Sequence, residues 1–276
     1  MSVTAAAHPG ELPTLDVSDT EPVPFGRLVA VELRKMRDTR AGLWLQVLTG
    51  GLLVLAAVIT LLVTTLEEVA VGADIVVQVM TIPVSLLMPV LAITCVTSEW
   101  SQRTGLVTFA LVPDRARVLL AKLVTVLLLA VSTIGLAVVT GVATLALHGL
   151  LGESAVDWSV DWSALAWTAA VQVLYFLMAF GLGLVVLSTP AAIAIFYVAA
   201  MLLPLMVYGP LFLASSWGQD VIPWIDLGFA TTPLTDPTGE SEVTGTTYAQ
   251  TAFTTLLWVV APLVGGFARV ARAEIT

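Results

Sequence analysis

The chain has few charged residues, one cysteine and two histidines. Of its 276 residues only 11% are Asp, Glu, Lys or Arg, whereas 58% are hydrophobic. A soluble domain carries about 25% charged residues, so this composition excludes an ordinary water-soluble globule. The single cysteine, Cys95, excludes a disulfide within the chain and a metal site built from several cysteines. We therefore expect a membrane protein without a metal centre.

Two further absences concern chemistry. The chain has no G-x-x-x-x-G-K-[ST] segment, the phosphate-binding loop of many ATPases, and no Gly is followed by Lys. Its long apolar runs contain no paired carboxylates and no His–Asp set, which disfavours an intramembrane hydrolase. The lack of ionisable groups deep in these runs also weakens a proton- or sodium-coupled carrier. We expect no enzyme activity, no catalytic residue and no cofactor bound by this chain.

Six apolar runs are long enough to cross a hydrocarbon layer of roughly 30 Å as helices. Their continuous hydrophobicity favours helices over barrel strands, in which apolar residues alternate with a period of two. The runs are Leu43–Leu66, Ile75–Thr97, Leu119–Leu147, Ala164–Ser188, Ala191–Ser216 and Gln250–Ala268. The sequence therefore predicts an all-α membrane protein with six transmembrane helices.

All basic residues fall on one side of these spans. They lie before the first span, between the second and third spans, and after the last one, whereas the segments on the other side carry only acids. Basic segments stay in the cytoplasm, so we expect both termini to be cytoplasmic. Arg outnumbers Lys, and Ala and Val are abundant, as in GC-rich bacteria. The predicted location is the plasma (cytoplasmic) membrane of a bacterium.

The chain before the first span divides into two parts. Residues 1–24 are acidic and rich in Pro and Thr, and they lack the basic start and apolar core of a signal peptide, which predicts a flexible cytoplasmic tail. The sequence of residues 25–41 predicts an amphipathic elbow helix at the inner membrane surface. Its apolar face consists of Phe25, Leu28, Val29, Leu33 and Met36, with the basic residues mostly elsewhere. The alternative is an ordinary anchor that only sets the topology.

The connection between the second and third spans, residues 98–122, is longer and more structured than a linker needs to be. Glu99 and Arg103 are spaced i, i+4 with the acid first, which favours a helix. The apolar face of that short helix would be formed by Trp100, Val107 and Leu111. Pro113 and Asp114 then predict a new helix start. A surface of this kind indicates contact with another protein, and the alternative is a topology signal only.

The order of residues in this connection follows the pattern of a known protein family. An acid is followed by a Thr-Gly pair, an apolar run, a Pro, basic residues and a Lys. Its members are Glu99, Arg103, Thr104, Gly105, Pro113, Arg115, Arg117 and Lys122. The pattern resembles the segment between the second and third spans of exporter-type ABC permeases of the second type. The likeness extends to the elbow-like helix and the six spans, from about Phe25 to Arg272, so that residues 25–276 would form one permease domain. The second half carries no motif of that family.

The resemblance implies a function and a set of partners. Residues 98–122 would form a coupling helix that rests in a groove of a separate ABC ATPase subunit, and that subunit would bind the ATP. The implied coupling residues are Glu99, Trp100, Arg103, Thr104, Gly105, Val107, Leu111, Pro113, Arg115, Arg117 and Lys122. Two permeases would pair, as a homodimer or as a heterodimer, in contact with membrane lipid and without nucleic acid. The alternatives are a non-transporting membrane scaffold or assembly factor and, less favoured, a secondary carrier.

The third span has a polar stripe. Ser132, Thr140 and Thr144 recur at multiples of four, and His148 continues the stripe at the outer end, where we interpret it as an incidental polar residue. Because small and hydroxyl-bearing residues let helices approach closely, helix packing is favoured over a translocation path. Prolines in the second and fifth spans predict kinks. They are Pro83, Pro89, Pro204 and Pro210.

The outer loop between the fifth and sixth spans, residues 217–249, is long for such a connection. Its part from Val221 to Leu234 is too apolar for free solvent. This composition predicts an interfacial or re-entrant segment. The alternative is a plain loop with Trp anchors at the interface.

Overall fold

The computed structural model describes residues 23–66, 72–101, 114–151, 156–236 and 238–272. This part of the chain is helical and contains no β-strand. Six helical segments are long and apolar enough to cross a membrane. They are Arg40–Leu66, Ala73–Trp100, Arg115–Leu151, Trp162–Val186, Thr189–Ala214 and Gly245–Arg272. The prediction of an all-α, multi-pass membrane protein is confirmed.

Most of the spanning helices run beyond the predicted apolar limits. The third begins at Arg115 rather than Leu119, and the sixth ends at Arg272 rather than Ala268. Helical hydrogen bonding does not stop where hydrophobicity stops, so the turns that carry charges at the membrane boundary continue the helix. Asp114 assists the start of the third span, because its carboxylate accepts a hydrogen bond from the Arg117 amide at 3.1 Å.

The first four spans pack around a central helix. They are α2 (Arg40–Leu66), α3 (Ala73–Ser101), α5 (Arg115–Leu151) and α6 (Trp162–Val186), and α3 packs against the other three. Thr133, Ala137 and Gly141 on α5 are buried. A Cβ at Gly141 would collide with Val77 of α3, so this stripe of small residues is a close helix-packing surface.

The last two spans contain wide helical turns next to prolines. Span five consists of α7 (Thr189–Tyr197), two π-helical segments and α8 (Gly209–Ala214), and span six of α11 (Gly245–Thr255), a π-helical segment and α12 (Ala261–Arg272). The π-helical segments are Val198–Leu202, Pro204–Tyr208 and Leu256–Val260. Each ends two residues before a proline, at positions 204, 210 and 262. Proline has no N–H with which to close an α-helical turn, and the helix widens there.

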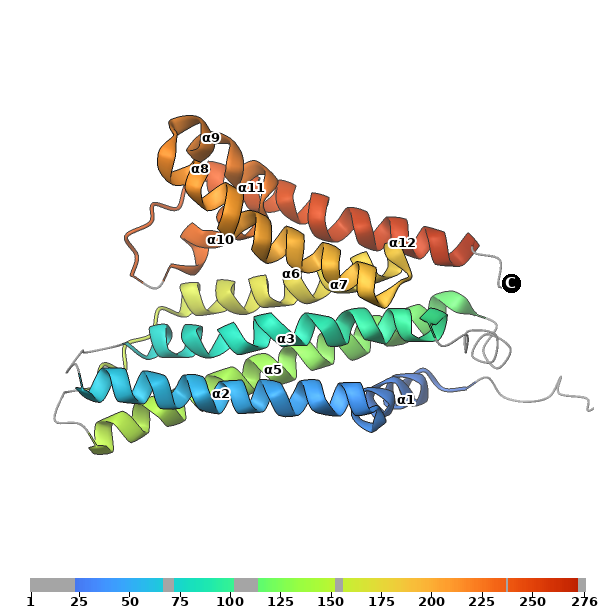
Figure 1. Cartoon of the computed structure of the whole chain (residues 1–276), viewed down its shortest axis with the longest axis horizontal. Helices are drawn as coiled ribbons and strands as arrows, with labels where there is room; N and C mark the ends of the chain where they lie inside the picture. The colour runs from blue at the N-terminus through green and yellow to red at the C-terminus, as the bar shows by residue number, and fades with distance from the viewer. Residues whose placement is uncertain (1–22, 67–71, 102–113, 152–155, 237, 273–276) are drawn as a thin grey trace, which may run out of the picture.

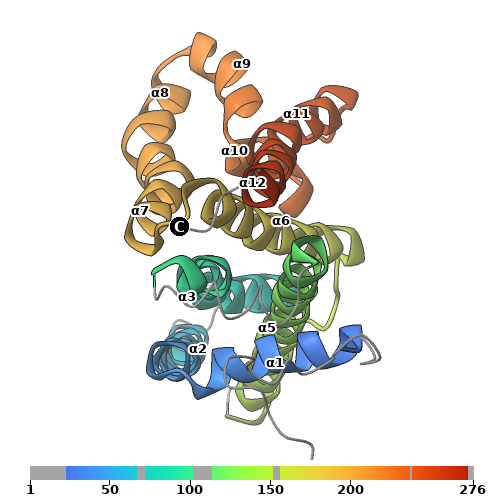
Figure 2. The same ribbon diagram turned by 90° about the vertical axis from the view of Figure 1, so that its right-hand side faces the viewer.

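Helix α1 (Phe25–Asp38) lies across the bundle rather than along it. Figure 2 shows α1 from the side while α2 is seen end-on. Its buried residues are Val29, Glu32 and Met36. The helix predicted over residues 25–41 ends earlier, because Thr39 adopts an extended conformation and α2 begins at the next residue.

Two short helices, α9 (Ser216–Ile225) and α10 (Leu227–Thr235), occupy the connection between spans five and six. The segment from Val221 to Leu234 is therefore helical rather than a plain loop. Trp258, halfway along span six, donates a hydrogen bond from Nε1 to the Ile225 carbonyl oxygen at 2.7 Å. The side chain of Asp226 caps α10 by accepting from the Phe229 amide at 2.9 Å, and burial raises the pKa of this carboxyl. These contacts pack the pair of helices onto the spans.

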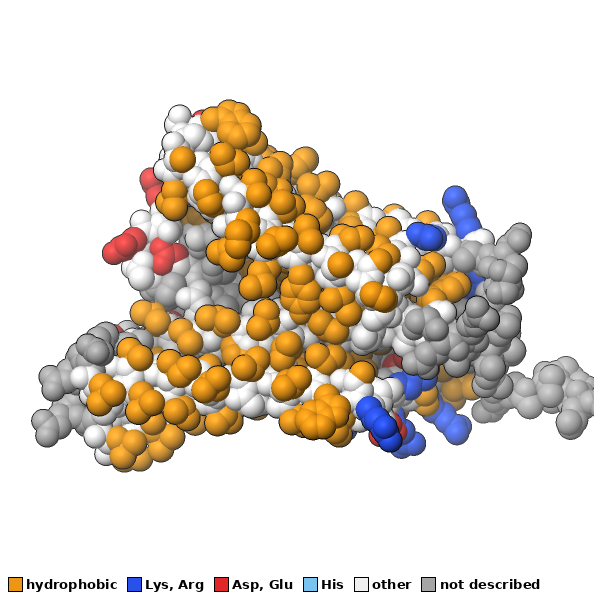
Figure 3. All heavy atoms as spheres, in the orientation of Figure 1, with side chains coloured by type: hydrophobic (Ala, Val, Ile, Leu, Met, Phe, Trp, Pro, Cys, Tyr) orange, Lys and Arg blue, Asp and Glu red, His pale blue; other side chains and the backbone are white. Residues whose placement is uncertain are grey.

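Charged side chains gather at the two ends of the molecule. Figure 3 shows Lys and Arg side chains at one end of the bundle, acidic side chains at the other end near α9 and α10, and hydrophobic side chains along the length between them. Many of those hydrophobic side chains are exposed, such as Val54, Leu213 and Val264. An exposed apolar belt between polar ends is the surface of a protein that lies in a bilayer.

The corner between α1 and α2 generates a stability prediction. A Cβ at Gly42 would collide with the carbonyl oxygen of Met36, whereas a Cβ at Gly51 on the same helix meets nothing within 4 Å. We expect Gly42→Ala to destabilise the fold by about 1–3 kcal/mol through overpacking. Gly51→Ala is the matched control and should not lower stability, because Ala favours a helix over Gly. Thermal unfolding of the purified chain in detergent measures both, and an equal melting temperature for the two variants would contradict the close approach.

Candidate functional site

Four charged side chains from three helices meet at the basic end of the bundle. This charge cluster consists of Glu32 and Lys35 on α1, Glu99 on α3 and Lys122 on α5. The Lys122 ammonium lies 2.8 Å from a Glu32 carboxylate oxygen and 3.1 Å from a Glu99 oxygen. The Lys35 ammonium lies 2.7 Å and 3.2 Å from oxygens of the same two carboxylates. Each carboxylate therefore joins two cations.

The cluster is buried except at Lys35. Lys122 is 1% exposed, and Glu32 and Glu99 are each 6% exposed. Lys122 also donates to the backbone carbonyl oxygen of Cys95 at 3.0 Å, so its ammonium has three partners in the interior. Removing a charge from water costs several kcal/mol, and mutual attraction offsets that cost only when partners and hydrogen bonds are complete. Two cations against two anions leave the cluster neutral.

The local sequence explains how each charge reaches the interior. Glu32 lies three residues after Val29 and four before Met36, which places it on the buried face of α1. Lys122 lies seven residues into α5, among the buried residues Val118, Leu119 and Ala121. The two charges are thus carried inward on apolar helix faces, where they pair with each other.

Several predicted coupling residues lie outside the described residues. They are Arg103, Thr104, Gly105, Val107, Leu111 and Pro113, so the predicted Glu99–Arg103 pair and the helix around it remain sequence-based. Trp100 is partly buried and packs against the hydrophobic core, and its predicted part in docking stays a prediction. Arg115 donates to the Val270 carbonyl oxygen at 3.3 Å and so connects α5 with α12.

Glu99 and Lys122, two of the predicted coupling residues, are buried and paired with each other in this structure. Their predicted part in coupling stays a prediction. Sequence reasoning missed Glu32 and Lys35 altogether. The available signal was an acid on the apolar face of an amphipathic helix, which predicts a buried cationic partner.

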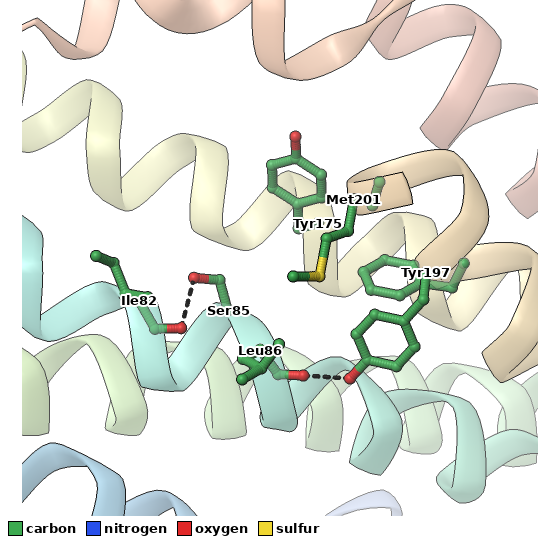
Figure 4. Close-up of a pocket in the computed structure, with 8 residues that line it drawn as sticks. Ile82, Ser85, Leu86, Tyr175, Tyr197 and Met201 are labelled. Carbon is green, nitrogen blue, oxygen red and sulfur yellow. Dashed lines mark hydrogen bonds between the residues drawn. The ribbon is translucent and has the colours of Figure 1, made fainter. Parts of the chain in front are cut away.

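A cavity of about 290 Å³, which we call the mid-span cavity, lies between α3, α6 and the start of span five (Figure 4). Its lining combines the aromatic rings of Tyr175, Phe196 and Tyr197 with aliphatic side chains, and no charged side chain is among the described residues that line it. Tyr197 donates its hydroxyl to the Leu86 carbonyl oxygen and so joins span five to α3. Ser85 also lines the cavity. The lining is mostly apolar and aromatic.

The predicted polar stripe of the third span does not form one surface. Thr144 is buried, Ser132 is exposed, and Thr140 is intermediate. Their hydroxyls donate to carbonyl oxygens of α5 itself, at 2.8 Å in each case, which is hydrogen bonding within the helix. None of the three lines the mid-span cavity.

His148 is buried at the acidic end. It is 3% exposed, and its Nδ1 lies 3.3 Å from the hydroxyls of both Thr64 and Thr65 on α2. These contacts connect α2 and α5 at that end. Among the described residues no group of three His, Cys, Asp or Glu side chains has the arrangement of a metal site.

The charge cluster generates a prediction about stability. Lys122→Met keeps the length of the side chain but removes the buried cation that pairs with both Glu32 and Glu99. We expect it to destabilise the protein by about 3–5 kcal/mol, since removal of one partner leaves a buried charge uncompensated. Arg34→Met, at an exposed position on α1, is the control and should have little effect. Thermal unfolding in detergent measures both.

A second variant separates charge balance from packing. The pair Glu32→Gln with Lys122→Met removes one charge of each sign and leaves Lys35 with Glu99, 3.2 Å apart. It should be more stable than Lys122→Met alone if the imbalance is what destabilises the single variant. A Lys122→Met protein as stable as the native one would show that the cluster contributes nothing.

Comparison with known proteins assigns no family to the chain. No protein-family model matches the sequence, and no curated protein is significantly similar to it. The functional argument therefore depends on the residues and their geometry.

Proposed function

We propose that this chain is the permease subunit of an ATP-binding-cassette transporter, an exporter in the cytoplasmic membrane of a bacterium. One observation carries the proposal. The charge cluster joins both helices that flank residues 102–113, α3 and α5, to the transverse helix α1. Separating these helices would leave a buried charge without its partner, so they resist moving apart. A displacement of the connecting segment would therefore move three helices together, as a docking point for an ATPase requires.

The energy for transport would come from a second protein. This chain has no phosphate-binding loop, so ATP would bind to and be hydrolysed by a separate ABC ATPase subunit. Closure of the ATPase would push on residues 98–122, and the charge cluster would pass that movement to the spans. The chain itself would contribute no catalytic residue and no cofactor site.

Pairing of two permease chains is supported by the exposure of span five. Only 11% of its most apolar stretch is buried within the chain, against 56% for α3. A long uncovered apolar helix needs lipid or another protein beside it. A second copy, or a related permease, would complete a twelve-span transporter with the mid-span cavities inside.

The chemistry of the mid-span cavity indicates a substrate class. Among the described residues the lining has aromatic rings and aliphatic side chains but no charged side chain, which suits an uncharged and largely apolar molecule. Tyr175 and Phe196 meet edge to face with ring centroids 6.5 Å apart, which gives the cavity a firm aromatic wall. Lipids and hydrophobic drugs have this chemistry.

The remaining alternatives differ in what they require. A secondary carrier needs an ionisable group on the ion pathway, but the buried Lys and Glu side chains of the described residues lie together at one end and neutralise one another. A scaffold or assembly factor would use the same basic end for binding, without ATP hydrolysis by its partner. Measurement of nucleotide turnover separates this alternative from the permease.

The proposal predicts a specific co-purifying partner. When the tagged chain is isolated from its native membranes, an ABC ATPase should accompany it, and the complex should hydrolyse ATP while the chain alone does not. Val107→Asp should abolish this recovery, because it places a charge on the expected apolar docking face and leaves the described core intact. Ala271→Asp, an exposed position at the same end of α12, is the matched control and should retain the ATPase.

Three results would contradict the permease proposal. One is the absence of any ATPase from the native preparation, and another is equal recovery with Val107→Asp and the native chain. The third is ATP turnover by a preparation free of other proteins. A partner without ATPase activity would favour the scaffold.

The proposed orientation has both termini and α1 on the cytoplasmic side, with α1 at the membrane surface. Single cysteines at three exposed positions test it, after Cys95→Ala removes the native thiol. Cysteines at positions 157 and 239 should react with a membrane-impermeant reagent in intact cells, and one at position 116 should react only after lysis. Labelling at position 116 in intact cells would reverse the orientation.

A further inference from the structure

A groove opens at the side of the bundle between α1, α2 and α5, with a volume of about 520 Å³. We call it the side groove. Its floor contains Met36, Thr49 and Met88, which are 6%, 1% and 2% exposed. Leu128 and Leu136 on its α5 wall are both 47% exposed. The groove is therefore open along the face of the bundle that lipid would cover.

The two ends of the side groove differ in polarity. Arg37 lines the end next to α1, is exposed, and has no hydrogen bond or ion pair with the described residues. Trp44, 61% exposed, lies two residues before the groove residue Gln46 on α2. Trp side chains favour the level of the lipid head groups, so this end of the groove lies at the membrane surface. The other end extends toward the middle of the bundle.

The interior of the groove offers little to a polar ligand. The hydroxyls of Thr49, Ser132 and Thr133 donate to carbonyl oxygens of their own helices at 2.8 to 2.9 Å. The groove follows α5 from Leu128 to Leu136, eight residues or about 12 Å of helical rise. One leaflet of a bilayer is about 15 Å deep in hydrocarbon. The shape and polarity therefore match an acyl chain below a charged head group.

We propose that the side groove binds one anionic phospholipid from the leaflet at the basic end of the protein. The Arg37 guanidinium would hold the phosphate through charge-assisted hydrogen bonds, for which its planar donors are suited. An acyl chain would lie between α2 and α5 over Thr49 and Met88. The lipid would contact the side of α1 away from the charge cluster, and so would hold α1 against α2 and α5. The site does not depend on what the protein transports.

Glycines on α2 offer a test with a matched control. A Cβ at Gly50, which lines the groove, would meet nothing within 4 Å, and the same holds at Gly51, which does not line it. Gly50→Leu should fill the groove without a clash against the backbone, whereas Gly51→Leu adds the same side chain outside it. Arg37→Gln removes the cation, and Arg34→Gln removes an exposed cation of the same helix that does not line the groove.

The experiment uses the full chain purified in detergent. Phosphatidylglycerol is added, and phosphatidylcholine with identical acyl chains and soluble glycerol 3-phosphate serve as comparisons. Native mass spectrometry counts bound lipid, and thermal unfolding reports stabilisation. The native chain should bind one phosphatidylglycerol in preference to phosphatidylcholine and should melt at a higher temperature with it. Gly50→Leu and Arg37→Gln should each weaken binding by about tenfold or more, whereas Gly51→Leu and Arg34→Gln should not.

Other outcomes would overturn the site. Equal binding of phosphatidylcholine would show that charge is not recognised, and equal loss with Arg34→Gln would show diffuse attraction rather than a site. Stabilisation by glycerol 3-phosphate alone would identify a soluble anion as the ligand. Retention of lipid by Gly50→Leu would place the lipid elsewhere. If Gly50→Leu fails to fold, the comparison of Arg37→Gln with Arg34→Gln still decides.

Discussion

Lys122 keeps its ammonium group inside the protein because Glu32 and Glu99 lie within 3.1 Å of it and the Cys95 carbonyl accepts a third hydrogen bond. In an interior of low dielectric an ammonium without these partners would cost several kcal/mol. The two carboxylates in turn need a second cation, which Lys35 supplies from the edge of the cluster. The arrangement of α1, α3 and α5 follows from this requirement, because each helix contributes a charge that the others must neutralise. Buried ion pairs therefore hold these three helices together at the basic end.

Spans five and six differ from the first four spans in helical geometry. Spans five and six contain three π-helical segments, each ending two residues before a proline, and span five is largely uncovered. Widened turns with incomplete α-helical bonding deform more easily than regular helix. The mid-span cavity lies where these two regions meet, between α3, α6 and the first π-helical segment. In the proposed transporter, the ATPase would act at the end that holds the charge cluster, and the π-helical segments would lie beside the cavity.

Helix α1 takes part in both proposed sites. Its Glu32 and Lys35 face the charge cluster, and its Leu33 and Arg37 line the side groove. Met36 lies between the two, buried on the face that contacts the bundle. The position of α1 is thus determined by buried ion pairs on one side and, in our proposal, by a lipid on the other. Loss of the ion pairs or of the lipid would therefore alter the packing of α1 against α3 and α5.

The sequence by itself determined the features that depend on local composition and periodicity. Continuous apolar runs gave six membrane-spanning helices, the spacing of Val29 and Met36 gave an amphipathic α1, and Asp114 marked the start of α5. Contacts between distant residues were decided only by the tertiary structure. Glu99 pairs with Lys122 and Lys35, and Trp258 donates to the Ile225 carbonyl oxygen, because helix packing brings these residues together. Hydrophobicity and helical periodicity are properties of neighbouring residues, so a single sequence is enough to predict the helices that depend on them. The partner of a buried charge depends on which helices meet and at what depth, and only the packed structure fixes that choice.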